Sequence, residues 1–227
     1  MPNETALLRL MSWMSPSFPV GAYTYSHGLE AAVEQAGITD RRSAGEWITD
    51  LVAEGAGRAD AVLLIHAWRA IANGDEELLA DVAAEAVALS PTSELALETE
   101  SQGAAFLKAV DAAWPTDAVN LLRKVHQGPV TYPIAVGVTA AGHQVALTET
   151  TVAYLHAFAA NLVSAVVRLV PLGQTDGLMI TSAIEPLLPK IAAVALATPL
   201  EQLSTSTLMA DIRSMQHETQ RTRLFRS

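Results

Sequence analysis

The chain has 227 residues, of which half are hydrophobic and only 5% aromatic, with no cysteine and a formal net charge of −10. Its length suits one large helical domain, and the lack of cysteine excludes disulfides and thiolate metal sites. The negative charge argues against a general nucleic-acid binder, which needs a basic face. With few aromatic rings, the core must consist mainly of Ala, Leu and Val, and Ala and Leu favour helices. The composition therefore predicts an all-α protein.

Apolar residues at helical spacing, separated by turn residues, predict a series of helices in the first half of the chain. Pro16 and Pro19 end the first of them, and Gly37 is expected to cap the second at its C-terminus. Asp75 is expected to cap the fifth helix at its N-terminus. The expected helices lie at 7–14, at 25–35, from 40 onward, at 61–72, from 75 onward, and at 93–113.

The second half contains one segment of ambiguous secondary structure, Thr131 to Ala141. Its β-branched residues favour a strand, but a lone strand would lack a sequential partner, so a buried helix is the preferred prediction. Further helices are expected at 118–126, across 155–169, and at 176–197 with a bend at Pro186 and Pro189. We therefore predict a single-domain bundle of about ten helices over residues 1–203. A C-terminal tail, residues 204–227, is expected to become ordered on partner binding.

The run from Thr150 to Val167 carries no formal charge and is long enough to be compared with a membrane span. It contains several alanines and polar residues, which make insertion into a bilayer unfavourable, so a buried helix is the preferred interpretation. The first fifteen residues lack the basic start and the small-residue cleavage site of a secretory signal. We expect a cytoplasmic protein that does not bind a membrane.

Motifs for catalysis are not found: the chain has no Walker A sequence, no dinucleotide-binding glycine turn and no nucleophile elbow. Its six histidines lack the i,i+3 or i,i+4 spacing typical of a helical metal site. His217, next to Glu218, is a weak metal candidate and is expected to be solvated. The carboxylates between Asp75 and Glu100 are interpreted as a solvated acidic face. We therefore expect no enzyme, no catalytic residue and no tightly bound cofactor.

Three segments have more specific sequences than helix connections require. The first, Ser15 to Gly28, combines prolines, glycines and aromatic rings, which is typical of a stiff loop that carries recognition. The second, Pro171 to Gly177, is a sharp turn in which Gly173 can adopt a positive φ. The third, Asp211 to Ser227, gives an acidic protein a basic end with an apolar pair between arginines.

Each segment also has a purely structural interpretation: rings packed in a connection, a turn that ends a helix, and a frayed terminus. The functional interpretation is that all three bind a partner protein. The partner-binding candidates are Ser15, Pro16, Phe18, Pro19, Gly21, Tyr23, Ser26, Gly28, Pro171, Gly173, Gln174, Asp176, Arg213, His217, Glu218, Arg221, Arg223, Leu224, Phe225 and Arg226.

In this order, the three segments resemble the UreF family of urease accessory proteins. The pattern is Ser-Pro-x-x-Pro-x-Gly-x-Tyr-x-x-Ser-x-Gly-Leu-Glu from Ser15, Pro-Leu-Gly-Gln-Thr from Pro171, and His-Glu-Thr-Gln-x-x-Arg-Leu-Phe-Arg-Ser from His217. Ser93-Glu94-Leu95 with Gln102-Gly103, and the segment from Gly128 to Ala140, support it. The similarity spans nearly the whole chain.

The resemblance implies an all-α homodimer that binds UreD, called UreH in some species. That complex recruits the GTPase UreG and delivers nickel to apo-urease, so nickel is handled by the complex and is not a resident cofactor. In the family the C-terminal segment is associated with contact to UreD. This role carries onto Arg213, His217, Glu218, Arg221, Arg223, Leu224, Phe225 and Arg226.

Two alternatives remain open at the level of sequence. The chain could activate the GTPase by inserting Arg221 or Arg223 beside the nucleotide, since arginine fingers raise such rates by roughly 10³ to 10⁵. It could also carry nickel directly through His217 or His27.

Overall fold

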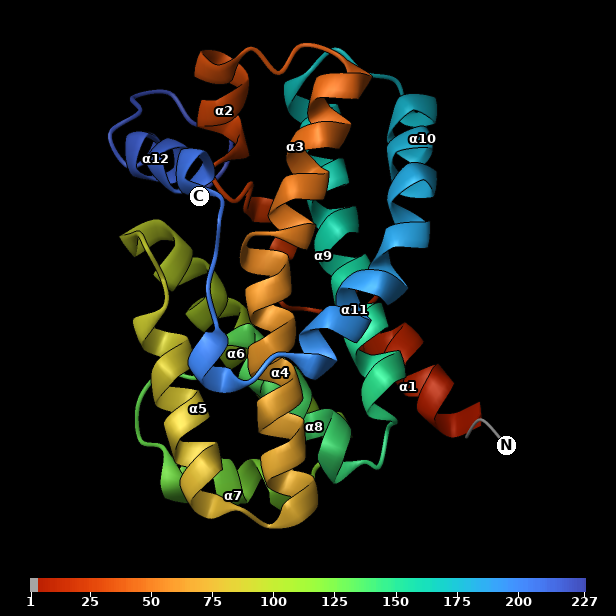
Figure 1. Ribbon diagram of the computed structural model, residues 1–227, viewed down its shortest axis with the longest axis vertical. Helices are drawn as coiled ribbons and strands as arrows, with labels where there is room; N and C mark the ends of the chain where they lie inside the picture. Colours follow the sequence, from red (N-terminus) through yellow and green to blue (C-terminus); the bar gives the residue numbers. More distant parts are fainter. Residues whose placement is uncertain (1–3) are drawn as a thin grey trace.

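The computed structural model describes residues 4–227, in which every regular element is a helix, so the all-α prediction is confirmed. The first three residues of the predicted 1–203 domain lie outside the described part. Figure 1 shows an elongated bundle with α4 crossing its centre. The α-helices are α1 (Glu4–Trp13), α2 (Leu29–Ala36), α3 (Arg41–Ala53), α4 (Ala56–Asn73), α5 (Glu76–Ala88), α6 (Ser93–Ala113), α7 (Asp117–Val125), α8 (Tyr132–Gly142), α9 (Leu147–Leu169), α10 (Gln174–Ile184), α11 (Leu188–Ala197) and α12 (Leu208–His217). Short 3-10 turns are η1 (Ala22–Thr24), η2 (Glu185–Leu187) and η3 (Leu200–Gln202).

Side-chain caps set where several helices begin. Asp40 accepts from the backbone N–H of Ser43 in a capping box at the start of α3. Asp75 accepts from the N–H of Leu78, which confirms its predicted role at α5. At the other end of α2, Gly37 has φ of 72°, the left-handed conformation expected of a C-terminal glycine cap.

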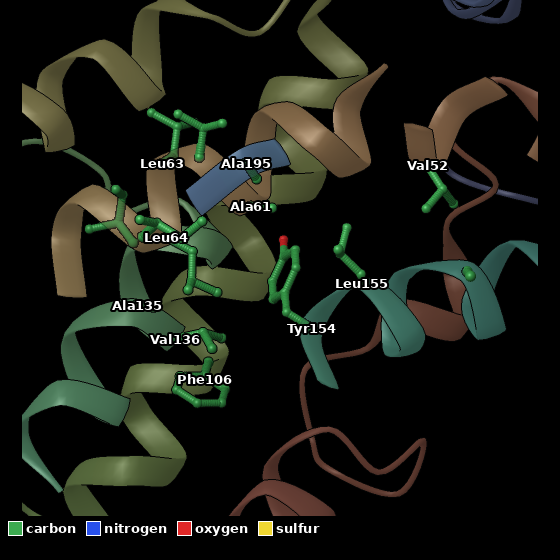
Figure 2. Close-up of a cluster of buried hydrophobic side chains, with 14 of the residues drawn as sticks. Val52, Ala61, Leu63, Leu64, Phe106, Ala135, Val136, Tyr154, Leu155 and Ala195 are labelled. Atoms are coloured by element: carbon green, nitrogen blue, oxygen red, sulfur yellow. The ribbon is translucent and has the colours of Figure 1, made fainter. Parts of the chain in front are cut away.

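The core forms around α4, which packs against α3, α5, α8, α9 and α11. The closest approach is to α8, where a Cβ on Gly137 would lie 2.5 Å from the carbonyl oxygen of Leu64. Only glycine therefore allows these two backbones to come so near. Figure 2 shows Leu64, Ala135, Val136 and Phe106 gathered at this junction.

The segment of ambiguous secondary structure is α8, so the preferred helix over Thr131 to Ala141 is confirmed. Pro133 lies in its first turn, where the missing N–H is tolerated. All residues from Pro133 to Ala140 are buried. Burial on every side explains why the segment lacks an amphipathic pattern and was hard to tell from a strand.

The two longest apolar helical stretches are α9 and the pair α10–α11. Within residues 4–227, these two stretches are long and apolar enough to cross a membrane, judged by length and composition alone. The inner face of α9 packs against α4, α10 and α11. The run from Thr150 to Val167 therefore lies in a helix with a buried face, as the sequence predicts. The predicted bend is confirmed, because η2 separates α10 from α11 at Pro186.

The C-terminal tail, residues 204–227, does not extend from the bundle. Figure 1 shows α12 lying beside α2, and the segment between α11 and α12 runs past α4. His217, Phe225 and Ser227 are buried. Carboxylates of the bundle satisfy polar groups of the tail. The expectation that this segment becomes ordered on partner binding stays a prediction.

Candidate partner-binding site

The tail rests on four buried polar side chains of α2 and the start of α6, which we call the tail seat: Glu30, Thr92, Glu94 and Glu98. The hydrogen bonds between the tail and the seat join residues more than 120 positions apart along the chain, so only folding brings them together.

Glu30 on α2 anchors the extended end of the tail. Its carboxylate accepts from the backbone N–H of Leu224 at 2.7 Å and from that of Phe225 at 2.9 Å. One of its oxygens also lies 3.3 Å from Nε2 of His217. A buried carboxylate is costly unless it is hydrogen-bonded in this way, so Glu30 and the tail depend on each other.

Glu94 and Glu98 on α6 bind two further points of the tail. Nδ1 of His217 lies 2.6 Å from Glu94, which also forms an ion pair with Arg223. The Ser227 hydroxyl donates to Glu98 at 2.5 Å. The His217 ring therefore faces a carboxylate at each nitrogen, Glu94 on one side and Glu30 on the other.

A second set of contacts fixes α12. The hydroxyls of Thr92 and Ser214 are 2.8 Å apart. Glu218 accepts from the N–H and the hydroxyl of Ser93, and these bonds hold the pKa of Glu218 below its usual value. Gly28, with φ of 74°, lies so close to α12 that a Cβ there would be 3.0 Å from the Ser214 nitrogen.

The first predicted segment, Ser15 to Gly28, meets the tail at its last residues only. The N–H of Ser26 donates to the carbonyl of Ser227 at 2.9 Å, and the N–H of Arg226 donates to the carbonyl of Thr24 at 2.9 Å. Phe18 is instead a core residue, packed on the rings of Phe106 and Trp114.

The remaining candidates of this segment differ in exposure. Ser15 and Gly21 are half-buried, whereas Pro16, Pro19 and Tyr23 are exposed. Gly21 has φ of 75°, a conformation that favours glycine. Thus Phe18 of the loop packs into the core, and Pro16, Pro19 and Tyr23 form a small exposed surface.

The second predicted segment, Pro171 to Gly177, begins α10 and makes no contact with the tail among the hydrogen bonds and ion pairs of residues 4–227. Asp176 accepts from the N–H of Gly173 and lies 3.5 Å from Arg41. Gly173 has φ of −79°, so the expected positive φ is wrong. The preceding helix, α9, ends without a positive φ at Gly173, because the backbone is already extended at Val170. Pro171, Gly173 and Gln174 are exposed.

Two sequence-based interpretations of polar residues are wrong. His217 is fully buried, not solvated, because both ring nitrogens find carboxylates. Glu94 and Glu98 do not belong to a solvated acidic face, because the tail covers them. In residues 4–227 no group of three or more His, Asp or Glu side chains is arranged to hold a metal ion.

The outer surface of the tail is apolar and basic. Leu208, Met209, Met215 and Leu224 are exposed large hydrophobic residues. Arg221 is exposed, and Arg226 lies over the ring of Tyr25. Phe225 points inward under Arg168. Apolar side chains bordered by arginines are typical of protein–protein interfaces.

Sequence reasoning missed a second buried polar cluster next to the seat. Tyr154 of α9 donates to Asp60 of α4 at 2.7 Å, and Figure 2 shows its hydroxyl directed toward α4. Burial raises the pKa of Asp60 to about 6. Burial opposes the charging of His27, but Glu98, 3.6 Å away, and other carboxylates outweigh it, so the pKa of His27 is raised.

Comparison with known proteins identifies the family of this chain. Residues 38–185 match the UreF family model. The chain is 51% identical to the urease accessory protein UreF of Xanthobacter autotrophicus, over 98% of this chain and 91% of that relative. It is 49% identical to the UreF of Azorhizobium caulinodans, over 97% and 95% respectively. Bradyrhizobium diazoefficiens has a UreF that is 45% identical over 99% and 93%. The chain belongs to the UreF family of urease accessory proteins.

Proposed function

We propose that this chain is a non-enzymatic scaffold for urease maturation in the cytoplasm. In this role it acts as a homodimer, binds UreD (UreH) and recruits the GTPase UreG, so that the complex inserts nickel into apo-urease. Nickel is cargo of the complex, and this chain needs no resident cofactor. Its family membership supports the urease connection.

The observation that carries the proposal is the outer surface of the tail. The tail presents Leu224, which is 65% exposed, next to Arg221, while the other side of the tail is bound by the tail seat. A rigidly held apolar and basic surface binds a partner at lower entropic cost than a free tail would. We infer that UreD contacts this surface.

Co-purification of the chain with UreD and UreG tests this assignment. Leu224→Ala and Arg221→Ala should each reduce recovery of UreD without changing the circular dichroism spectrum of the chain. Leu178→Ala on α10 is the matched control, because Leu178 is similarly exposed, at 70%, and lies on a helix that is not part of the tail. Equal losses in Leu224→Ala and Leu178→Ala would contradict the placement of the UreD site on the tail.

A second candidate function is activation of the GTPase by a tail arginine. Arg221 favours it, because the side chain is exposed and forms no ion pair in residues 4–227, whereas Arg223 is held by Glu94. Single-turnover GTP hydrolysis by UreG with this chain and UreD separates the two functions. Acceleration that disappears in Arg221→Ala but persists in Arg42→Ala supports activation. Unchanged hydrolysis in an intact complex supports the scaffold alone.

A further inference from the structure

The carboxylates of the tail seat, on Glu30, Glu94 and Glu98, carry more negative charge than the fixed cations around them balance. Each of these residues is at most 9% exposed. In residues 4–227, Arg223 is the one Lys or Arg that forms an ion pair with any of them. A buried carboxylate is costly unless it is paired or hydrogen-bonded, so additional positive charge stabilises the seat. The remaining groups that can supply this charge are the histidines that face it.

His217 of the tail lies between two of these carboxylates. Its Nδ1 is 2.6 Å from Glu94 and its Nε2 is 3.3 Å from Glu30, and the ring is fully buried. A neutral imidazole has one N–H, so it donates to one carboxylate only and turns a lone pair toward the other. The doubly protonated ring donates to both. The geometry of the seated tail therefore favours the charged form of His217, which joins α2 to α6.

The other partners of these two acids do not replace His217. Arg223 binds Oε1 of Glu94, whereas His217 faces Oε2, so the two cations use different oxygens. Two backbone N–H groups of the tail bind Glu30, but these donors are neutral. Within residues 4–227, His217 is thus the one cationic partner of Glu30 among its hydrogen bonds and ion pairs.

His27 faces the third carboxylate of the seat. Its Nδ1 lies 3.6 Å from Glu98, which also accepts from the hydroxyl of Ser227 at 2.5 Å. Burial opposes the charging of His27, but Glu98 outweighs it, together with Asp60 of α4 and Asp211 of α12, so the pKa of His27 is raised. Asp211 belongs to the tail, and seating therefore adds an acid to those that act on His27.

We propose that the tail seat is a proton-linked latch, in which seating of the tail takes up a proton at His217 and loss of that proton loosens the tail from α2 and α6. A proton that is bound in the seated state makes seating weaker as pH rises. Imidazole titrates between about pH 5 and pH 8, so the change falls near physiological pH. The raised pKa of His27 acts with the same sign, because its stabilising charge is complete below 6.5 and is lost as pH rises through the raised value. The latch sets how firmly the outer surface of the tail is held, whichever protein binds it.

Tryptic cleavage after Arg223 in the full-length chain measures the latch directly, because the N–H of the next residue, Leu224, is bound to Glu30. The rate is measured from about pH 6 to about pH 8.5, a range that spans the titration of imidazole. Division by the rate for a free peptide of residues 218–227 removes the pH dependence of trypsin itself. The normalised rate should rise about fivefold or more, since one released proton changes an equilibrium by up to tenfold per pH unit.

Three substitutions assign the effect to His217. His217→Gln, whose amide does not ionise, should be cleaved faster than the wild-type chain at the acidic end of the range and should show a flat profile. His217→Lys, which is charged throughout the range, should be cleaved more slowly than the wild-type chain at the alkaline end, also with a flat profile. His156→Gln is the matched control, because His156 is an exposed histidine on α9, and it should keep the wild-type profile.

A flat profile of the wild-type chain would overturn the proposal, as would a rise with pH that persists in both variants of His217. Flattening of the profile in His156→Gln to the same extent as in His217→Gln would also overturn it, because titration outside the seat would then govern the tail. Co-purification with UreD at a single pH is a separate measurement, so the latch and the proposed function can fail independently.

Discussion

Replacement of Glu30 by alanine should release the tail while the bundle stays folded. Glu30→Ala removes the acceptor for the N–H groups of Leu224 and Phe225 and one of the two carboxylates facing His217. Charged contacts of the tail remain, because Glu94 still pairs with His217 and Arg223. The extended end of the tail nevertheless loses the carboxylate that accepts from its backbone.

The magnitude follows from the bonds that are lost. A hydrogen bond to a charged group contributes about 1.5–3 kcal/mol, so two such bonds give roughly 3–6 kcal/mol of lost docking free energy. The loss in global stability is smaller, because the freed N–H groups reach water once the tail detaches. Global unfolding should therefore weaken only by the free energy with which the tail docks in the wild-type chain.

Two measurements separate these effects. Trypsin should cleave after Arg223 at least about tenfold faster in Glu30→Ala, whereas urea unfolding followed by circular dichroism should keep a single transition. Glu34→Ala is the matched control, since Glu34 is an exposed acid on the same helix. If the tail of Glu30→Ala is cleaved as slowly as that of Glu34→Ala, Glu30 does not hold the tail, and the description of the seat is wrong.

Two further substitutions test the same packing. Gly28→Ala should lower the melting temperature more than Gly74→Ala, because both glycines have positive φ but only a Cβ at position 28 would meet α12; equal shifts would show that the close approach to Ser214 is unimportant. Phe225→Ala should speed tryptic cleavage of the tail, since removing a buried ring costs about 3–5 kcal/mol. Phe225→Leu, which keeps an apolar side chain, should speed it much less, and identical effects would place Phe225 outside the core.

Local signals predicted most of the helices. Asp75 needs only its neighbours in sequence to cap α5, and Gly37 ends α2 through its own conformational freedom. The bend at Pro186 likewise follows from the missing N–H of proline. Such features depend on few residues, and a single sequence contains them.

The tail seat depends on contacts between distant parts of the chain, and this explains why it was missed. Glu94 and Glu98 lie within a run of acids, and composition alone makes them indistinguishable from solvated neighbours such as Glu85. One signal was present. Glu94, Glu98 and Gln102 recur at i, i+4 and i+8, so they form a polar stripe on one face of α6. Only His217 and Arg223, far along the chain, show what covers that stripe.

The environment of Asp60 also depends on a contact between distant parts of the chain, its hydrogen bond with Tyr154. This environment makes a pH-dependent prediction possible. Its pKa is raised from 3.8 to about 6 because the carboxyl is buried, and the hydrogen bond from Tyr154 offsets only part of this rise. Between these two values the folded chain binds more protons than the unfolded chain, so stability falls as pH rises. A shift of this size corresponds to roughly 3 kcal/mol, lost progressively from about pH 4 to above pH 6. The raised pKa of His27 acts in the same direction, since its stabilising charge is lost as pH rises.

Asp60→Asn isolates the contribution of this carboxyl. The amide oxygen can still accept from the Tyr154 hydroxyl, but the side chain no longer ionises. The free energy of unfolding of Asp60→Asn minus that of the wild-type chain should be small near pH 4 and should grow in favour of the variant up to about pH 7. Asp81→Asn, at an exposed position on α5, should show no such trend. A difference that stays constant with pH would mean that Asp60 ionises as freely in the folded chain as in the unfolded one, and that it does not lie in the buried polar cluster described above.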